Sequence, residues 1–502
     1  MMNFHLGAIA RYSPLLFTTA LALAFSNPAQ AQTTTLTQCN EAGLRSAIDS
    51  TPNGGQINFQ CPANTTINLA AEIQLGKTLN LNGRNSPNLT INGQNRTRLF
   101  RLANQNLTLQ NLTLQGGNVA NIVGNLSCEG GAIHITRGTL TLNNVILTNN
   151  HAARGGAICG NYQASLVIND SQLISNTGNQ GGAIMAHTSD LRITNSTFRN
   201  NSTRVGQSLN GSGGAIYTFD ALNKQNPILI QGSRFEGNKA YHEGGAVFIS
   251  QGNGVNAIIR NSTFYRNEAL IDSQGIGSGG AIRLAHAGTQ SNTQIVNVVF
   301  AENAADQEGG AIWAGGGRAN LHLNFNQVTF TDNKAGRVPD PEKNETGGGA
   351  MLLATGLESR IVINYTTFVR NEANHETSGA IYLNSDFVGG NIRHQNITLR
   401  NSIFDRNCSR KALAGMATPT CSHLVHATTM RRDGSNFVPA PLAGANVFEW
   451  IQNVHQPSGT QFGLTANSQV RDVKVRPYRD SGAATPNHPC SDVDAGSGRL
   501  CQ

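Results

Sequence analysis

Residues 264–267 of this chain read Phe-Tyr-Arg-Asn, and residues 279–282 read Gly-Gly-Ala-Ile. The same two motifs alternate through the middle of the 502-residue sequence. Phe-x-x-Asn occurs seven times, and two earlier copies carry Leu in place of Phe. Copies of Gly-Gly-Ala begin at Gly130, Gly155, Gly181, Gly213, Gly244, Gly279, Gly309 and Gly348, with a degenerate copy at Ser378. Repetition of this kind indicates a stack of similar structural units.

The repeated unit is too short to fold alone. Successive Gly-Gly-Ala copies start 25 to 39 residues apart, and no unit contains ten residues of helical periodicity. Each unit instead holds short stretches typical of strands, such as Val-Phe-Ile at 247–249 and Ile-Val-Ile at 361–363. Because one such unit leaves its apolar face in water, units must stack. We therefore predict an all-β fold, a right-handed parallel β-helix with one unit per coil.

Each repeated residue has an expected place in such a coil. The aliphatic residue after Gly-Gly-Ala and the Phe or Leu of the turn motif should form two inward columns. The asparagine of the turn motif should bond to its equivalents in neighbouring coils and satisfy buried backbone groups. The paired glycines permit positive φ and close approach of the backbone at corners.

These interleaved motifs resemble the repeats of the polymorphic outer membrane proteins, a family of pectin-lyase-like, right-handed parallel β-helices. The resemblance runs from about Asn111 to Asn407. It implies a surface-exposed or secreted protein, often with an adhesive role.

The chain divides into four predicted parts. Residues 1–31 are typical of a secretory signal peptide, with Arg11, an apolar run and a final Ala-Gln-Ala. Residues 32–110 are expected to hold the N-terminal cap and first coils, residues 111–407 the β-helix repeats, and residues 408–502 a C-terminal cap and tail. Within the cap, Asn40 to Ser50 should form a short amphipathic helix that covers the first coil. We expect an exported protein, extracellular or on the cell surface, with the periplasm as a further possibility.

The cysteines favour disulfides, because their number is even and the chain is expected to be exported. The simplest connectivity joins sequence neighbours and staples both ends of the rod. The predicted pairs are Cys39–Cys61, Cys128–Cys159, Cys408–Cys421 and Cys490–Cys501.

Composition limits the partners. The chain has 36 Lys and Arg against 29 Asp and Glu, without a basic run or an aromatic-basic platform. This mild positive charge argues against nucleic acid and favours a polysaccharide or another cell-surface component. After the signal peptide no apolar segment is long enough for a transmembrane helix. No Cys-x-x-Cys or His-Glu-x-x-His motif occurs, so we predict no metal site and no cofactor.

The first candidate binding surface is the outward position that follows each inward aliphatic residue. This column is rich in aromatic and apolar residues, which is unusual for a fully wetted face. It is either a stripe on which sugar rings stack or a surface covered by the longer segments between coils. The candidate binding residues are Tyr217, Phe248, Arg283, Trp313 and Tyr382.

The second candidate surface lies within the turn motif, at Arg266, Glu302, Asp332 and Arg370. Two carboxylates on adjacent coils, flanked by arginines, could bind Ca²⁺ and place an arginine for β-elimination. A surface ladder of salt bridges explains the same pattern without any catalysis, although such exposed pairs are individually weak.

The sequence therefore favours a non-enzymatic rod, adhesin-like, that presents a long surface to polysaccharide or cell-surface partners. The alternative is a polysaccharide lyase or glycoside hydrolase of β-helix fold, with Ca²⁺ required only in the lyase case.

Overall fold

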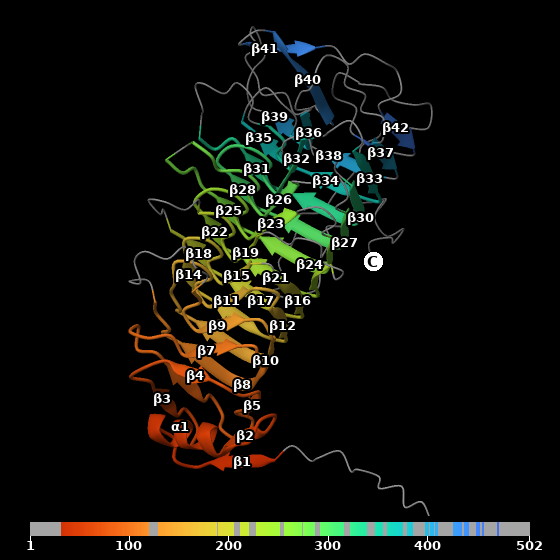
Figure 1. Cartoon of the computed structure of the whole chain (residues 1–502). Helices are drawn as coiled ribbons and strands as arrows, with labels where there is room; N and C mark the ends of the chain where they lie inside the picture. Colours follow the sequence, from red (N-terminus) through yellow and green to blue (C-terminus); the bar gives the residue numbers. More distant parts are fainter. Residues whose placement is uncertain are drawn as a thin grey trace, which may run out of the picture.

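In the computed structural model the chain forms a long rod of stacked coils, with its N-terminal end at one tip (Figure 1). The structure describes residues 32–409 with internal gaps, and parts of residues 425–470. Outside the described residues are 1–31, 120–128, 188, 205–210, 220–226, 252–255, 274, 287–291, 316–321, 339–346, 355–358, 375–378, 385–396, 401, 406, 410–424, 434–435, 441–447, 452–453, 456–468 and 471–502. The predicted signal peptide thus lies outside them.

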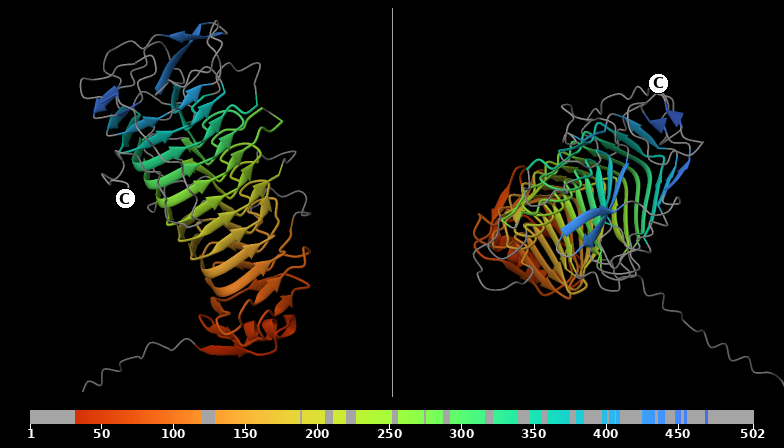
Figure 2. Two further views of the ribbon diagram at one scale, coloured as in Figure 1. Left: turned by 180° about the vertical axis from the view of Figure 1, so that it is seen from behind. Right: turned by 90° about the horizontal axis from the view of Figure 1, so that it is seen from above.

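Three sheets run along the rod, and successive coils add strands to each of them (Figure 2). Sheet A contains β1 (Thr33–Leu36), β2 (Gln56–Phe59), β3 (Thr66–Asn68), β5 (Leu79–Asn82), β6 (Thr90–Asn92), β8 (Leu107–Gln115), β10 (Thr139–Thr148), β12 (Ser165–Asn169), β13 (Gln172–Ile174), β16 (Asp190–Thr194), β17 (Thr197–Arg199), β20 (Ile228–Gln231), β21 (Arg234–Glu236), β24 (Ala257–Tyr265), β27 (Asn292–Ala301), β30 (His322–Thr331), β33 (Arg360–Asn364), β34 (Thr367–Val369), β37 (Ile397–Arg400), β38 (Ile403–Asp405), β42 (Phe448–Ile451), β43 (Val454–His455) and β44 (Gln469–Val470). Sheet B contains β4 (Ile73–Leu75), β7 (Phe100–Ala103), β9 (Ile133–Thr136), β11 (Ile158–Asn161), β15 (Ile184–His187), β19 (Ile216–Phe219), β23 (Val247–Gln251), β26 (Ile282–His286), β29 (Ile312–Gly315), β32 (Met351–Ala354), β36 (Ile381–Asn384), β40 (Val425–Asp433) and β41 (Asn436–Ala440). Sheet C contains β14 (Thr177–Gly178), β18 (Ser202–Thr203), β22 (Lys239–Ala240), β25 (Glu268–Ala269), β28 (Ala304–Ala305), β31 (Lys334–Ala335), β35 (Glu372–Ala373) and β39 (Cys408–Ser409).

Neighbouring coils pair in parallel and keep equivalent residues opposite each other. In sheet B, Ile282 lies opposite Val247 of one neighbouring coil and Ile312 of the other. The strands of successive coils pair in parallel, whereas the isolated bridge between Gly211 and Tyr241 and the hairpin of β40 and β41 are antiparallel. The predicted parallel β-helix is therefore confirmed.

The two predicted inward columns form the core. The aliphatic column of sheet B is buried from Ile133 to Ile381. In sheet A the phenylalanines of the turn motif stack in parallel, with ring centroids 4.7 to 5.1 Å apart between Phe198 and Phe368. Stacking identical side chains at the coil spacing buries each ring against its two neighbours, so the core is continuous along the axis.

The turn-motif asparagines form the predicted ladder, and Asn267 shows the pattern. Its Nδ2 donates to Oδ1 of Asn303 at 2.9 Å and to the backbone oxygen of Phe235 at 3.0 Å. Its Oδ1 accepts from the backbone N–H of Asn238 at 3.1 Å and from Nδ2 of Asn238 at 2.9 Å. The ladder is buried throughout and comprises Asn150, Asn176, Asn201, Asn238, Asn267, Asn303, Asn333, Asn371 and Asn407.

The glycine pair has two separate roles at the corner that leads into sheet B. The first glycine adopts the left-handed conformation, with φ of 70° at Gly213. The second glycine lies against the next coil: a Cβ on Gly214 would come 2.0 Å from the carbonyl oxygen of Gly245. A side chain there would force the coils apart, so the second position excludes every residue except glycine.

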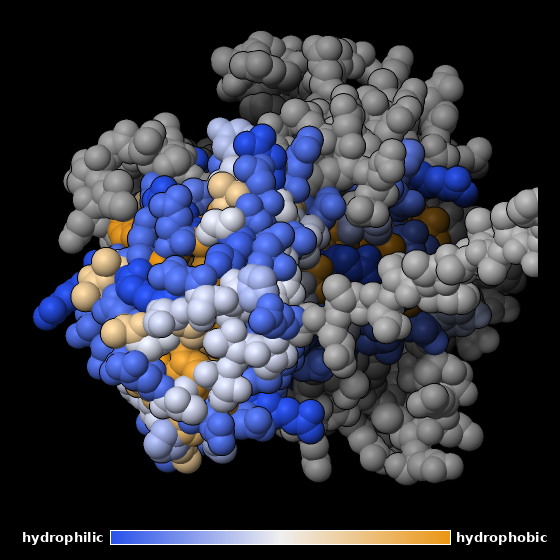
Figure 3. All heavy atoms as spheres, turned by 60° about the horizontal axis from the view of Figure 1, so that its bottom comes forward, coloured by the Kyte–Doolittle hydropathy of each residue, from blue (hydrophilic) through white to orange (hydrophobic). Residues whose placement is uncertain are grey.

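The N-terminal end is closed by α1 (Glu41–Ser50), as predicted. The side chain of Asn40 caps this helix by accepting a hydrogen bond from the N–H of Gly43, and Leu44, Ala47 and Ile48 are buried against the first coils. The predicted disulfide between Cys39 and Cys61 is present. Figure 3 shows that this end of the rod presents mostly hydrophilic side chains to solvent.

Parallel stacking continues beyond the predicted repeat boundary at residue 407. Strand β40 pairs with β36, β42 pairs with β37, and β43 pairs with β38. Cys159 and Cys408 are each disulfide-bonded. Their predicted partners Cys128 and Cys421, and the predicted pair Cys490–Cys501, lie outside the described residues.

Replacing Asn267 by alanine should lower the free energy of unfolding by about 3 kcal/mol, because each buried group left without a partner costs about 1–3 kcal/mol. Urea denaturation followed by circular dichroism measures the change. Asn324→Ala is the control, since Asn324 is exposed on β30, and it should change stability by less than about 0.5 kcal/mol. Equal stability of the two variants would show that the ladder does not support the fold.

Candidate functional site

The outward column of sheet B follows the rod with one residue per coil, as predicted. Tyr217 and Phe248 lie opposite each other and stack, with ring centroids 4.7 Å apart. Together with Cys159 and Met185 they form an apolar cluster separate from the core. Further along, Trp313 packs against a second outward cluster formed by Leu352, Ala354 and Tyr382.

Most of this column is shielded from solvent. The exposed fractions are 7% for Tyr217, 8% for Phe248, 8% for Arg283 and 1% for Tyr382, whereas Trp313 is half-buried. Of the five predicted binding residues, only Trp313 therefore has substantial solvent contact. Burial favours the interpretation that the column is covered, and the roles of these five residues in binding remain predictions.

Arg283 is held from two sides. Its Nε donates to Oε1 of Glu243 at 2.7 Å, and its guanidinium lies 3.2 Å from the centroid of the Trp313 ring. Burial raises the pKa of Glu243, but the charges and hydrogen bonds of Arg283 and His242 together outweigh burial, so the pKa is lowered overall. The indole N–H of Trp313 donates to Glu308 at 2.6 Å. The arrangement fixes the ring of Trp313 on one side by a cation and at its edge by a carboxylate.

A buried histidine, His242, extends this network, although its sequence forms no complete metal-binding motif. Nδ1 of His242 lies 3.2 Å from the hydroxyl of Ser212 and 3.5 Å from Oε2 of Glu243. Nε2 of the same ring lies 3.6 Å from Oδ2 of Asp272. Ser212 and His242 are buried, with 2% and 5% of their surface exposed, which keeps solutes away from this hydroxyl. We therefore regard the group as structural.

The turn-motif column forms ion pairs. Nε of Arg266 lies 2.7 Å from Glu302, and Nε and Nη2 of Arg370 each lie 2.7 Å from the carboxylate of Asp332. All four residues have positive φ, between 51° and 57°. Each carboxylate thus already has an arginine partner, which favours the salt-bridge ladder over a Ca²⁺ site at this column.

The described residues hold no group of three or more His, Cys, Asp or Glu side chains arranged to bind a metal.

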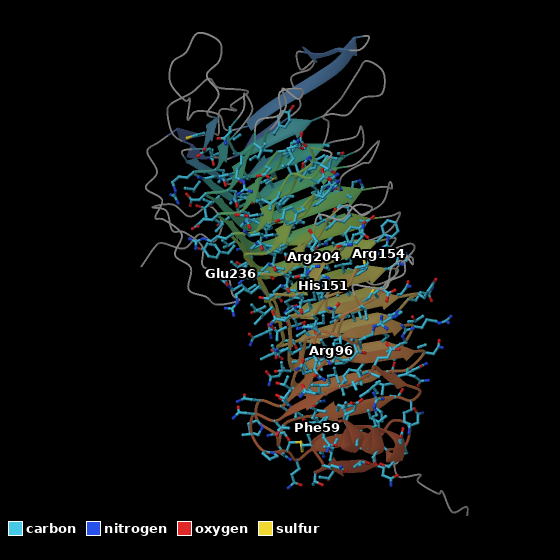
Figure 4. All side chains as sticks on the ribbon, turned by 90° about the vertical axis from the view of Figure 1, so that its left-hand side faces the viewer. Phe59, Arg96, His151, Arg154, Arg204 and Glu236 are labelled. Atoms are coloured by element: carbon cyan, nitrogen blue, oxygen red, sulfur yellow. A yellow bond between two sulfur atoms is a disulfide. The ribbon has the colours of Figure 1, made fainter. Side chains whose placement is uncertain are left out.

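A third surface, not singled out from the sequence, is formed by the segments that lead into sheet B on the side of sheet C. We call it the turn face. As far as they are described, its segments are 93–98, 116–119, 129–131, 150–156, 176–182, 201–204, 211–214, 238–245, 267–280, 303–310, 333–338 and 371–374. Figure 4 looks onto this side of the rod, where Arg96, His151, Arg154 and Arg204 face the viewer.

The charge of the turn face changes sign along the rod. Up to Gly214, the acidic residue among its described positions is Glu129, which is buried and bonded to Arg98 at 2.8 Å. Beyond that point acids predominate, and several form a network: Arg337 contacts Asp306 and Glu268, and Lys239 contacts Glu268. The sequence could have revealed this asymmetry only by sorting charges by coil position, because the net charge of the whole chain conceals it.

Two histidines of the basic part are neutral near pH 7. Burial, with a smaller contribution from Arg98 and Arg101, lowers the pKa of His134 to about 4. Burial and the nearby Arg204 lower the pKa of His151 to about 4. The positive charge of this surface therefore comes from its arginines.

Comparison with known families identifies the repeat. The model of the Chlamydia polymorphic membrane protein repeat matches residues 195–218 and 297–315. Each matched stretch contains one Phe-x-x-Asn turn, one ladder asparagine and one Gly-Gly-Ala strand of sheet B. Two stretches of the chain therefore match the polymorphic membrane protein repeat. The predicted resemblance is confirmed, and the repeat accounts for the column residues described above. Among curated proteins, none matches the sequence.

A solved structure of a polysaccharide lyase shares the fold of these repeats. The PL6 family alginate lyase AlyGC superposes with a TM-score of 0.51 and 13% sequence identity over 93% of this chain. An arginine-to-alanine mutant of that enzyme gives a TM-score of 0.47 at the same identity and coverage. The chain spans 57% of the enzyme's length. At this identity the likeness shows the parallel β-helix fold alone. Within the described residues no helix has the length and apolar character to cross a membrane.

Replacing Arg283 by methionine should destabilise the rod by about 3–5 kcal/mol, because it leaves Glu243 buried without its partner. The double variant Glu243→Gln/Arg283→Met should recover part of this loss. As the control, Arg266→Met breaks an exposed pair and should cost about 0–1 kcal/mol. Chemical denaturation of all three variants measures the differences. If Arg283→Met proves at least as stable as Glu243→Gln/Arg283→Met, then Glu243 and Arg283 do not form a stabilising buried pair.

Acid should destabilise the protein through His134 and His151. Because their folded pKa of about 4 lies below the ordinary 6.5, the folded state binds fewer protons than the unfolded state. The folded state is therefore destabilised as the pH falls from 6.5 towards about 4, because it holds both rings neutral while the unfolded chain takes up protons. Melting temperatures measured across this range should fall less steeply in His134→Gln/His151→Gln than in the unaltered protein. Identical slopes would show that neither ring is held neutral.

Proposed function

We propose that this protein is an exported, adhesin-like rod that binds an anionic polysaccharide or a comparable anionic polymer of a cell surface. The uneven distribution of charge supports this proposal. Residues 73–235 contain 12 Lys and Arg against 4 Asp and Glu, whereas residues 236–381 contain 10 against 14. The charge excess concentrated in residues 73–235 creates a local field that attracts a polyanion even when the whole chain is only mildly basic.

Many cations in the basic half are available to a ligand. Arg84, Arg96, Arg137, Arg192, Arg199 and Arg204 are exposed. Within the described part of the chain their side chains form no ion pair. The cations of the other half are largely engaged, as Arg283, Arg337 and Arg370 show. Unpaired surface arginines bind carboxylate or sulfate without first giving up an internal partner.

The shape of the rod suits a polymeric ligand. Each coil adds about 4.8 Å along the axis, so equivalent side chains recur at a fixed interval. A polymer that contacts several coils gathers many weak contacts into a useful affinity. The polymorphic membrane protein repeat is that of a surface-protein family, which supports an exported location and a cell-surface partner.

Catalysis is the alternative. The shared fold with an alginate lyase favours it, whereas the ion pairs that engage Glu302 and Asp332 oppose it. A lyase would produce unsaturated ends that absorb ultraviolet light from a uronate polymer with Ca²⁺ present, and Arg266→Ala or Arg370→Ala would abolish the signal. We expect no absorbance change.

The protein should bind polygalacturonate and alginate but not neutral dextran, and the affinity should fall as salt is raised because salt screens exposed charges. Biolayer interferometry with immobilised polysaccharide measures both effects. Equal binding to dextran, or binding to the uronate polymers that salt does not weaken, would contradict an anionic ligand.

A further inference from the structure

Resting on the proposed function, we infer that an acidic glycan binds along the turn face of the first coils, parallel to the rod axis, with Arg96, Arg154 and Arg204 each contacting an acidic sugar. The ligand class is a polysaccharide that carries carboxylates or sulfates at least on every second sugar.

The coil register places these three arginines on alternate coils. The backbone oxygen of Thr97, next to Arg96, accepts from the N–H of Asn118. Asn118 pairs with His151, and His151 pairs with Thr177. Thr177 in turn lies opposite Ser202, two residues before Arg204. Arg96, Arg154 and Arg204 therefore sit on the first, third and fifth of five consecutive coils.

This spacing matches a sugar chain that runs along the axis. Two coils correspond to about 9.6 Å and four coils to about 19 Å. One coil is close to the length of one pyranose unit, so a sugar chain along the turn face advances about one residue per coil. An arginine on every second coil then faces every second sugar.

The residues on the coils between the arginines can form hydrogen bonds with the hydroxyl groups of the sugars. The intervening coils present Asn118, Thr177, Asn179 and Gln180, all partly exposed. Amide and hydroxyl groups exchange hydrogen bonds with sugar hydroxyls without adding charge. His151 lies in the middle and is neutral, since burial and Arg204 lower its pKa to about 4.

Repulsion limits the length of the bound segment. Before Gly214 the acid of the described turn face is Glu129, paired with Arg98, whereas beyond Gly214 its described positions carry six Asp and Glu against three Lys and Arg. A polyanion that continued past Arg204 would meet this net negative charge, so binding should involve about four or five sugars, one for each coil of about 4.8 Å.

Two double variants with the same charge change test the placement. Arg96→Ser/Arg204→Ser removes two exposed arginines from the turn face. Arg192→Ser/Arg199→Ser removes two exposed arginines from β16 and β17, on the outer face of sheet A in the same half of the rod. Binding of the full-length variants to polygalacturonate is measured by interferometry, with circular dichroism to confirm folding.

The turn-face variant should lose about tenfold in affinity, equivalent to about 1.4 kcal/mol. The sheet A variant should lose less than about threefold, because salt screens charges that lie farther from the bound polymer. If both variants lose affinity equally, the inferred site is wrong while the proposed function stands. If the unaltered protein does not bind the polymer at all, the proposed function itself fails.

Oligogalacturonides of increasing length give an independent test. Affinity should rise steeply up to four or five sugars, which span about 19 Å, and then level off. A continued rise with length, or equal affinity for the disaccharide, would overturn the axial placement.

Discussion

The buried amide of each ladder asparagine bonds at once to the coil before it and the coil after it, and the rod depends on this arrangement. The turn that follows the Phe-x-x-Asn motif leaves a backbone N–H inside the protein, where water cannot reach it. Asn303 supplies the missing acceptor, and its Nδ2 donates to the backbone oxygen of Phe264 on a preceding coil and to Asn333 on the next coil. Because the bonds require equal coil spacing, they hold the phenylalanine stack and the aliphatic column of sheet B in register. Flat, evenly spaced faces on the outside follow from the same constraint.

Because the inward residues are nearly the same in every coil, the outward residues can differ from coil to coil. The residue after Asn267 and its equivalents in neighbouring coils changes from Lys239 to Glu268 to Ala304 without altering the backbone pairing. Segments between the ladder and the glycine pair also vary in length, from the short connection at 176–181 to the longer one at 267–279. The repeat motifs therefore determine the coil, whereas the charged residues on its outside determine which partner it can bind.

The sequence predicted the interior well and the surface poorly, for a physical reason. Ile282, Phe264 and Asn267 repeat because each meets its own equivalent on the next coil, so their environment can be read from the motif itself. Arg283 was expected to face a ligand, yet it meets Glu243, forty residues earlier in the chain. That contact depends on how intervening segments bend, which the motif does not encode. Burial of Tyr217 and Tyr382 has the same origin, whereas the capping helix was predictable because Asn40 and the apolar face of the helix are local signals.

The ladder also gives the rod a dipole along its axis. From Asn150 to Asn371, Nδ2 of each ladder amide donates to the asparagine of the following coil, and Oδ1 accepts from the preceding coil. The second N–H of each Nδ2 donates to a backbone oxygen of the preceding coil. Dipoles aligned head to tail add together, as peptide dipoles do in an α-helix. The positive pole of this column lies towards Asn407 and the negative pole towards Asn150. The acidic coils of residues 236–381 therefore lie nearer the positive pole than the basic coils of residues 73–235 do.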